Sequence, residues 1–122
     1  QIFLANESEY QMLSGKSELL EAAKTLLLMG PQIAVIKMGQ KGCAVMTQDE
    51  TTFVDGFQVN VVDATGAGDA FNAAFLTAIL ESRSLLEAAK FANAVGALTT
   101  TRLGAQIAQP TREQADILAT RK

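Results

Sequence analysis

The chain has 122 residues, of which 48% are hydrophobic and 19% charged, a composition typical of one globular domain. Its net charge of −3 gives no basic surface for nucleic acid, and no run of about 18 apolar residues predicts a membrane span. The absence of histidine excludes Ser-His-Asp catalysis, Cys-His catalysis and histidine-ligated zinc, so a general base must be a carboxylate, lysine, tyrosine or thiolate.

The chain begins with a predicted strand and a short helix. Residues 1–5 form an apolar run typical of a buried strand, without the basic stretch and long apolar segment of a signal peptide. Because the chain opens at Gln1 inside this run, we expect the C-terminal piece of a longer protein. Asn6 and Glu9 have the spacing of a capping box, which starts a helix that Gly15 ends.

A second helix and three strands follow. Leucine and alanine at helical spacing predict a helix over 17–30. Apolar and β-branched residues predict strands at 33–39 and 42–47, joined by a turn at 40–41. A further strand is predicted within 51–57.

Cys43 lies in one of these strands and is the only cysteine of the chain. It excludes an internal disulfide and is typical of a reducing compartment, so we expect a cytoplasmic protein. Because Cys43 lies in an apolar strand, we interpret it as a buried, inert thiol.

The pattern then changes from strands to helices. Alternating apolar and polar residues over 57–61 predict a half-buried strand. A helix over 68–82 has almost no polar face, which predicts burial on nearly all sides. Ser84 and Glu87 form a second capping box, which starts a helix that runs to about Thr99.

A loop and an amphipathic helix complete the chain. The loop spans 99–110, and Pro110 opens the helix, with Ala115, Ile117 and Leu118 facing inward. The hexapeptide LLEAAK occurs at both 19–24 and 85–90, but its flanks differ, so we interpret it as two similar helix starts. The order of elements predicts an α/β fold in which helices cover a sheet.

The stretch VVDATGAGDAF, residues 61–71, is the strongest functional signal. A strand ends at Asp63 and a helix begins near Gly68, and glycines between them let the backbone approach a ligand closely. The first N–H groups of a helix and its dipole favour an anion such as phosphate. Asp69 then suits a base that takes a proton from a hydroxyl attacking a phosphate. The structural alternative is a tight turn followed by a helix-stabilising acid.

Three other places each have a structural and a functional interpretation. Asn6 and Glu9 either form only a capping box or act near phosphates and hydrated Mg²⁺. Residues 37–42 form either only a hairpin turn or a backbone lining for adenine or ribose. Asn93, in an apolar helix, makes either a helix contact or an edge of a ligand site.

Together these stretches resemble the ribokinase/PfkB family of carbohydrate kinases. VVDATGAGDAF resembles the family's C-terminal signature, and NESE resembles its N-x-x-E element. VIKMGQKGC resembles its strand-turn-strand before the nucleotide, and FANAVGALTTTRLGAQ resembles the segment behind the adenine. The resemblance spans almost the whole chain and implies a ribokinase-like α/β fold. Residues 1–122 would be the C-terminal ATP-binding and catalytic-base part, without the N-terminal sugar-binding half and its lid.

The resemblance implies ATP-dependent phosphorylation of a sugar or sugar-acid hydroxyl. Asp69 would be the general base, and the amides of Gly66, Ala67 and Gly68 would form the anion hole for the transferred phosphate. The rival hypothesis is a nucleotide-binding module or an inactive relative that kept the fold. The missing half of the sugar site leads us to expect little activity from this chain alone.

The resemblance also implies cofactors and partners. Asn6 and Glu9 would act on the phosphate and Mg²⁺ side, with Glu9 acting through water. The residues that would border ATP are Lys37, Gly39, Gly42 and Asn93. A K⁺ or other monovalent cation would lie near Asp63 and Thr65 and the carbonyls around Thr99, Arg102 and Gly104. The partner would be a small sugar or sugar acid rather than nucleic acid or a membrane. The resemblance is also compatible with a homodimer in the full-length form.

Overall fold

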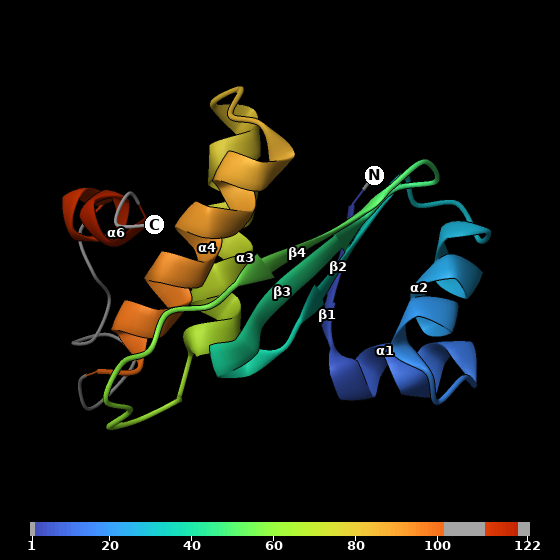
Figure 1. The fold of residues 1–122 in the computed structure, drawn as a ribbon, viewed down its shortest axis with the longest axis horizontal. Coiled ribbons are helices and arrows are strands. Elements are labelled where there is room, and N and C mark those ends of the chain that lie inside the picture. The colour runs from blue at the N-terminus through green and yellow to red at the C-terminus, as the bar shows by residue number, and fades with distance from the viewer. Residues whose placement is uncertain (1, 102–111, 120–122) are drawn as a thin grey trace. The chain divides into compact units, whose positions relative to one another are not determined.

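The computed structural model describes residues 2–101 and 112–119. Its contacts divide the chain into two compact units, one ending at Val54 and the other beginning at Asp55. The first unit holds the sheet and two helices, and the second is helical (Figure 1). In the described ranges, no helix combines the length and apolar character that a membrane crossing requires.

The first unit is built on a mixed sheet with the strand order β1-β2-β3-β4. The strands are β1 (Ile2–Asn6), β2 (Ile33–Lys37), β3 (Gly42–Met46) and β4 (Thr51–Asp55). Strands β1 and β2 are parallel, and β2 and β3 are antiparallel. The predicted sheet is therefore confirmed, and it is a mixed sheet. The turn expected at 40–41 is part of a short 3₁₀ helix, Gly39–Lys41.

Two helices of the first unit pack against this sheet. Helix α1 (Glu7–Ser14) begins with the predicted capping box at Asn6 and ends at Gly15, whose φ of 73° is left-handed. Helix α2 (Leu19–Leu27) is shorter than predicted at both ends. It begins after Glu18, whose carboxylate caps it by accepting from two amides of its first turn, and it ends before its C-cap, Leu28. Alanine and leucine side chains of α2 join the sheet's apolar face in one core.

Tyr10 anchors α1 to the first strand. Its side chain is fully buried, and its hydroxyl donates to the Phe3 carbonyl oxygen at 2.9 Å. The two rings meet edge to face, with centroids 5.2 Å apart. Burial raises the pKa of the Tyr10 phenol, so this group stays a neutral donor. Cys43 is buried in β3, as predicted.

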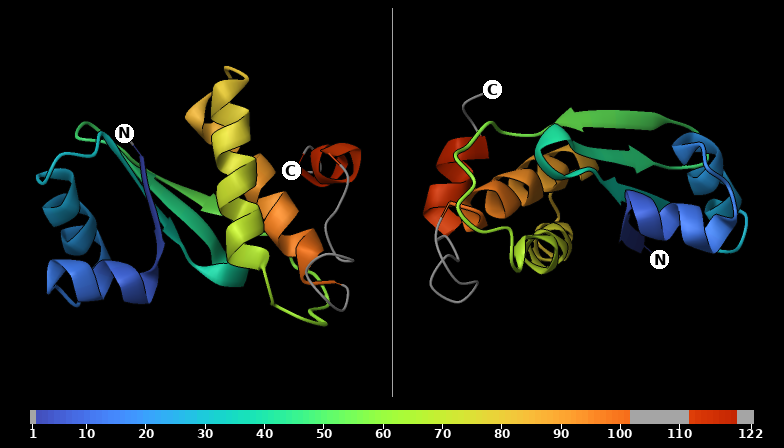
Figure 2. Two further views of the ribbon diagram at one scale, coloured as in Figure 1. Left: turned by 180° about the vertical axis from the view of Figure 1, so that it is seen from behind. Right: turned by 90° about the horizontal axis from the view of Figure 1, so that it is seen from below.

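The second unit contains α3 (Ala67–Leu80), α4 (Leu85–Thr99) and α6 (Arg112–Ala119). Helices α3 and α4 lie side by side (Figures 1 and 2). The predicted capping box at Ser84 starts α4. The interpretation of LLEAAK is confirmed as well, because both copies open a helix, α2 and α4.

The strand predicted over 57–61 is absent from the structure. Residues 56–62 join no ladder in the described part of the chain. Phe57 is buried as the alternation requires, but Val61 is exposed. The alternating pattern was therefore insufficient, because a strand also needs a partner strand, and this segment joins no ladder among the described residues.

The prediction that α3 is buried on nearly all sides is wrong. Phe71 and Phe75 are buried, but 43% of Leu76 and 85% of Leu80 are exposed. The buried face packs against α4, and the opposite face carries apolar side chains without a covering element in the second unit's described residues. The apolar composition of a helix indicates how much surface it could bury, but not how many other elements pack against it.

The last helix agrees with the prediction where the structure describes it. Ala115 is fully buried, and Leu118 is partly buried. The side chain of Ile117, the loop over 102–110 and Pro110 lie outside the described residues.

Arg83 links α6 to the turn between α3 and α4. The Arg83 guanidinium bonds the Asp116 carboxylate at 3.1 Å and lies over the Phe91 ring, 4.7 Å from its centroid. These two contacts hold α6 beside the turn that joins α3 to α4.

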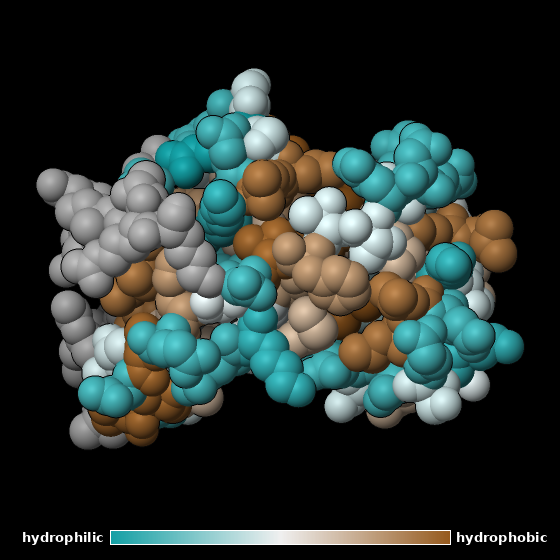
Figure 3. Space-filling view, viewed as in Figure 1, coloured by the Kyte–Doolittle hydropathy of each residue, from teal (hydrophilic) through white to brown (hydrophobic). Residues whose placement is uncertain are grey.

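Exposed apolar side chains are also present in the first unit. The space-filling view shows apolar surface between polar patches on the face drawn (Figure 3). The large exposed apolar residues of this unit are Met12, Leu13, Leu28, Met29 and Phe53.

Ser82 gives a direct test of the turn between α3 and α4. Its φ of 65° lies in the left-handed region, which costs an L-residue about 1–2 kcal/mol. Ser82→Gly removes this cost but adds about 0.4–1 kcal/mol of unfolded-state entropy. We expect a net stabilisation of about 0.5 kcal/mol in urea unfolding.

Ser84→Gly is the matched control for Ser82→Gly. Ser84 has an ordinary φ of −65° and caps α4, so glycine there should lower stability by a few tenths of a kcal/mol. An unchanged or lower urea midpoint for Ser82→Gly would contradict the left-handed strain.

Candidate active site

The segment before α3 forms a tight turn that ends at a glycine. The Asp63 Oδ1 accepts from the Thr65 amide at 2.9 Å, which closes the turn after the extended segment. Gly66 caps α3 with φ 79° and ψ −2°, a left-handed conformation that favours glycine. The tight turn predicted from VVDATGAGDAF is therefore present, and it delivers the chain directly into a helix N-terminus.

The amides of this turn differ in their partners. The Ala67 amide donates to the Ala64 carbonyl oxygen at 3.2 Å, and the Ala70 amide makes the first helical bond, to Gly66, at 2.9 Å. Within residues 2–101 and 112–119, the amides of Gly66 and Asp69 have no acceptor. Such open amides at a helix N-terminus, together with the helix dipole, suit an anion.

Asp69 is exposed in the first turn of α3, next to these amides. Its carboxylate makes no hydrogen bond or ion pair with the described residues. A first-turn acid with only a structural role commonly accepts from a backbone amide, as Glu9 and Glu87 do in the two capping boxes. The Asp69 carboxylate is instead available to a ligand, and Gly68 is exposed beside it.

The end of α4 lies against the start of the turn. The Thr100 carbonyl oxygen accepts from the amides of Val62 at 2.7 Å and Asp63 at 3.0 Å. Thr99 is fully buried, and its hydroxyl donates to Val95 within the helix at 2.7 Å. The structure thus brings Asp63 close to the end of α4.

The predicted cation residues are described only in part. Asp63 and Thr65 share the turn and Thr99 stands at the end of α4, whereas Arg102 and Gly104 lie outside the described residues. No group of three or more carboxylate, cysteine or histidine side chains gathers in the described ranges. The oxygens that the turn does offer are carbonyls, a hydroxyl and one carboxylate, which are the ligand types of hard cations.

Asn93 makes the helix contact that its burial requires. It is 6% exposed, and its Nδ2 donates to the Asp55 carbonyl oxygen at 3.2 Å. This bond joins α4 to the segment that leads toward the turn.

The first unit gathers a second set of predicted residues. Asn6 ends β1 and Lys37 ends β2, and the two are direct partners in the parallel register. Gly39 follows in the connection to β3 and Gly42 begins β3, and both have a positive φ. These residues therefore share the carboxyl edge of the parallel strand pair, the edge where α/β sheets bind ligands. The Met38 amide bonds the Gly42 carbonyl oxygen at 2.9 Å, which confirms the hairpin-type turn.

The capping box of α1 uses part of the hydrogen-bonding capacity of Asn6 and Glu9. The Glu9 amide donates to Asn6 Oδ1 at 2.9 Å, and the Asn6 amide donates to Glu9 Oε1 at 2.9 Å. The structural interpretation of NESE is therefore confirmed. In the described chain, Asn6 Nδ2 and Glu9 Oε2 remain for other contacts.

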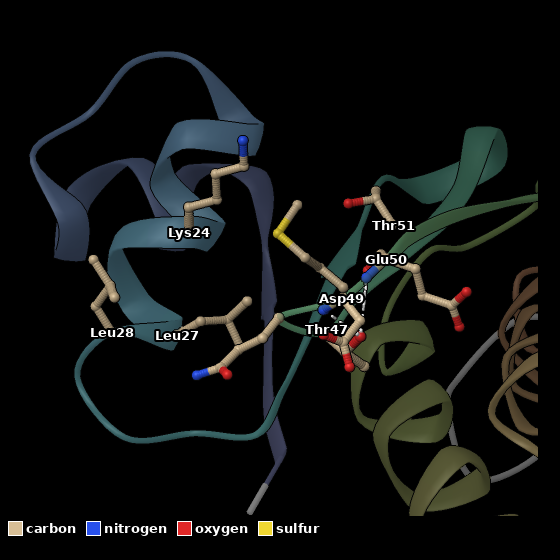
Figure 4. Close-up of a pocket in the computed structure, with 9 residues that line it drawn as sticks. Lys24, Leu27, Leu28, Thr47, Asp49, Glu50 and Thr51 are labelled. Carbon is tan, nitrogen blue, oxygen red and sulfur yellow. Dashed lines mark hydrogen bonds between the residues drawn. The ribbon is translucent and has the colours of Figure 1, made fainter.

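A groove of about 550 Å³ that the sequence did not indicate lies elsewhere in the first unit (Figure 4). Leu27 of α2 and its C-cap Leu28 line one side, and residues 46–51, from the end of β3 to the start of β4, line the other. Met46 pairs with Ala34 near the start of β2, so the groove lies at the end of the sheet opposite to Asn6 and Lys37. It is separate from the predicted site residues.

Comparisons with known proteins identify the family. The model of the pfkB family carbohydrate kinases matches residues 1–112. The ribokinase of Haemophilus influenzae is 36% identical over 118 residues, which are 93% of this chain and 39% of that protein. This chain therefore spans about two fifths of the length of that relative.

Solved structures agree with the sequence match. The Arabidopsis thaliana ribokinase, complexed with ribose and ATP, has a TM-score of 0.92 and 31% identity over 100% of this chain and 41% of its own. A Vibrio cholerae fructokinase with fructose, ADP and calcium ion has a TM-score of 0.89 and 31% identity, covering 97% and 40%. A double mutant of that fructokinase was solved with fructose, ADP and potassium ion. The ribokinase-like α/β fold is thus confirmed, and the chain belongs to the pfkB family of carbohydrate kinases.

Proposed function

We propose that this chain supplies the ATP-binding and catalytic-base part of a kinase that phosphorylates a sugar or sugar-acid hydroxyl. The observation that carries the proposal is the available carboxylate of Asp69 beside the open amides at the start of α3. Relatives named ribokinase and fructokinase, two of them solved with a sugar and an adenine nucleotide, support the substrate class.

The chemistry follows from what each group can accept or donate. Asp69 takes the proton of the substrate hydroxyl as that oxygen bonds the γ-phosphorus of ATP, and the bond to the β-γ bridging oxygen breaks. Charge on the transferred phosphoryl oxygens is met by the amides of Gly66, Ala67 and Gly68 and by the dipole of α3. The Ala67 amide would have to replace its hydrogen bond to the Ala64 carbonyl oxygen by one to the phosphoryl group. At 3.2 Å, that bond is longer than the helical bond from the Ala70 amide to the Gly66 carbonyl oxygen, at 2.9 Å.

The carboxyl edge of the first unit suits the nucleotide side. Asn6 Nδ2 and Glu9 Oε2, which the capping box leaves over, would act toward the phosphates and a hydrated Mg²⁺. Bound Mg²⁺ would neutralise charge on the ATP phosphates. The backbone at Gly39 and Gly42 would line the nucleotide together with Lys37. In the second unit, Asn93 is a separate candidate for a nucleotide contact. A Cβ added at Gly39 would meet no atom within 4 Å, so the space there is open to a ligand.

The monovalent cation would lie near the Asp63–Thr65 turn, with oxygens around Thr99, Arg102 and Gly104. The potassium ion in the fructokinase double mutant supports this part of the proposal. Most sugar-binding groups would come from a part of the kinase that this chain does not contain. We therefore propose little activity for residues 1–122 alone, and a cytoplasmic, homodimeric form for the complete kinase.

Asp69→Asn tests the base in the complete polypeptide that the gene encodes. Asparagine keeps the shape of the side chain but cannot take a proton, so turnover should fall by about 10²–10⁴-fold. The KM for ATP should stay within about twofold, because the carboxylate acts on the hydroxyl rather than on nucleotide binding. The measurement is ADP release with a sugar that the wild type phosphorylates.

Asp49→Asn is the control for Asp69→Asn. Asp49 is an exposed carboxylate in the turn between β3 and β4, so its turnover should equal that of the wild type. Wild-type turnover for Asp69→Asn would refute the assignment of the base and favour a different catalytic group.

Glu9→Gln separates capping from a role toward Mg²⁺. Glutamine also closes a capping box, so the melting temperature should hardly change. Loss of the negative charge should raise the Mg²⁺ concentration needed for half-maximal turnover. The readout is turnover of the complete polypeptide against Mg²⁺ concentration.

Glu87→Gln is the matched control, because Glu87 holds the same position in the capping box of α4. Hydrogen bonds from Ser84 lower the pKa of Glu87, so Glu87→Gln removes a negative charge at neutral pH. Glu87→Gln should leave the Mg²⁺ dependence unchanged. If both variants match the wild type, Glu9 has only its capping role.

A further inference from the structure

One face of α4 and its C-cap lie against the segment that connects β4 to α3 at three points. Asn93, Gly96 and Thr100 are spaced by three and four residues, so they lie in a row along the helix. The connecting segment starts at Asp55 and ends at Ala67. Asn93 and Thr100 hydrogen-bond to the segment, and Gly96 faces its end.

The first contact fixes the start of the segment and the second fixes its middle. Asn93 donates to the Asp55 carbonyl oxygen at 3.2 Å. The Thr100 carbonyl oxygen accepts from the consecutive amides of Val62 and Asp63 at 2.7 and 3.0 Å. Thr100 caps the end of α4, where the carbonyl oxygens have no amide donor within the helix. The amides of Val62 and Asp63 supply donors for one of them.

The third contact fixes the end of the segment. A Cβ added to Gly96 would lie 3.6 Å from the Ala67 carbonyl oxygen and 3.8 Å from Phe71 Cβ. These are ordinary contact distances, so alanine fits without a shift. Any atom beyond Cβ would need space that the first turn of α3 occupies, because protein interiors pack closely.

We propose that this face of α4, formed by Asn93, Gly96 and Thr100, positions the turn whose amides receive the phosphate. A residue no larger than alanine at position 96 leaves the first turn of α3 room to approach, and Asn93 and Thr100 hold the segment that leads into it. Asn93 is thereby a positioning residue through its bond to Asp55, in addition to any contact with nucleotide. The inference rests on the proposed function, because phosphate binding at these amides is what gives the position of the turn its importance.

The test is a size series at Gly96 in the complete polypeptide, followed by amide NMR. Gly96→Ala, Gly96→Ser and Gly96→Val add increasing volume at one point. Ala73→Val is the control, because it adds the same two methyl groups as the step from alanine to valine at an exposed position of α3. Valine and serine are better helix formers than glycine, so any loss in the series comes from crowding and not from propensity.

The first readout uses no ligand. We expect Gly96→Ala to leave the amide signals of residues 64–69 in place, and Gly96→Ser and Gly96→Val to shift them progressively. Ala73→Val should leave the signals of residues 64–67 unchanged. Unshifted signals across the whole series would overturn the positioning role, whatever the chain binds.

The second readout is titration with inorganic phosphate, followed at the amides of Gly66 and Asp69. We expect about tenfold weaker binding for Gly96→Val and intermediate binding for Gly96→Ser, at unfolding temperatures close to that of Gly96→Ala. If Gly96→Val does not fold, equal phosphate affinity for Gly96→Ala and Gly96→Ser overturns the inference. A wild-type chain whose amides do not respond to phosphate contradicts the proposed function instead, and the ligand-free spectra still decide the positioning role.

Discussion

The amides at the start of an α-helix have no acceptor within the helix, and the candidate site of this chain is built on that constraint. Gly66 makes it usable, because its left-handed backbone delivers the chain into α3 without a side chain in the way. The Asp63 carboxylate closes the preceding turn and the Asp69 carboxylate stays available beside it. The two acids of one short motif therefore have different tasks, one inside the turn and one toward a ligand.

The helix that carries this site depends on its neighbour. Phe71 and Phe75 bury one face of α3 against α4, and the rings stack with centroids 6.2 Å apart. The same α4 holds the connecting segment through Asn93 and Thr100. Packing and site geometry are thus coupled: a change that moves α4 relative to α3 also moves the amides that would receive phosphate.

Local signals in the sequence predicted much of this structure. Both capping boxes, the glycine after α1 and the turn at Asp63 depend on residues within four positions of each other, so their geometry could be read from the chain. The candidate residues at the sheet edge were also predictable, and the register that pairs Asn6 with Lys37 brings them together. Parallel strands with apolar sequences place their carboxyl ends at one edge.

The predictions that failed concern properties that depend on other segments of the chain. Residues 57–61 have a strand pattern, but pairing also depends on a partner strand, and the segment joins no ladder in the described chain. Leu80 belongs to an apolar helix but is exposed, because burial depends on what packs against it. The contact between Gly96 and the first turn of α3 was equally invisible, since a glycine in a helix gives no sign of which backbone approaches it.

Transfer of phosphate tests the central claim most directly. The complete polypeptide would be incubated with γ-labelled ATP, Mg²⁺ and a panel of sugars and sugar acids, and label would be followed into the sugar by mass spectrometry. The account predicts that at least one sugar gains the labelled phosphate in a one-to-one ratio with ADP. Binding of ATP with no labelled product from any sugar would contradict it, and would identify a nucleotide-binding relative without kinase activity.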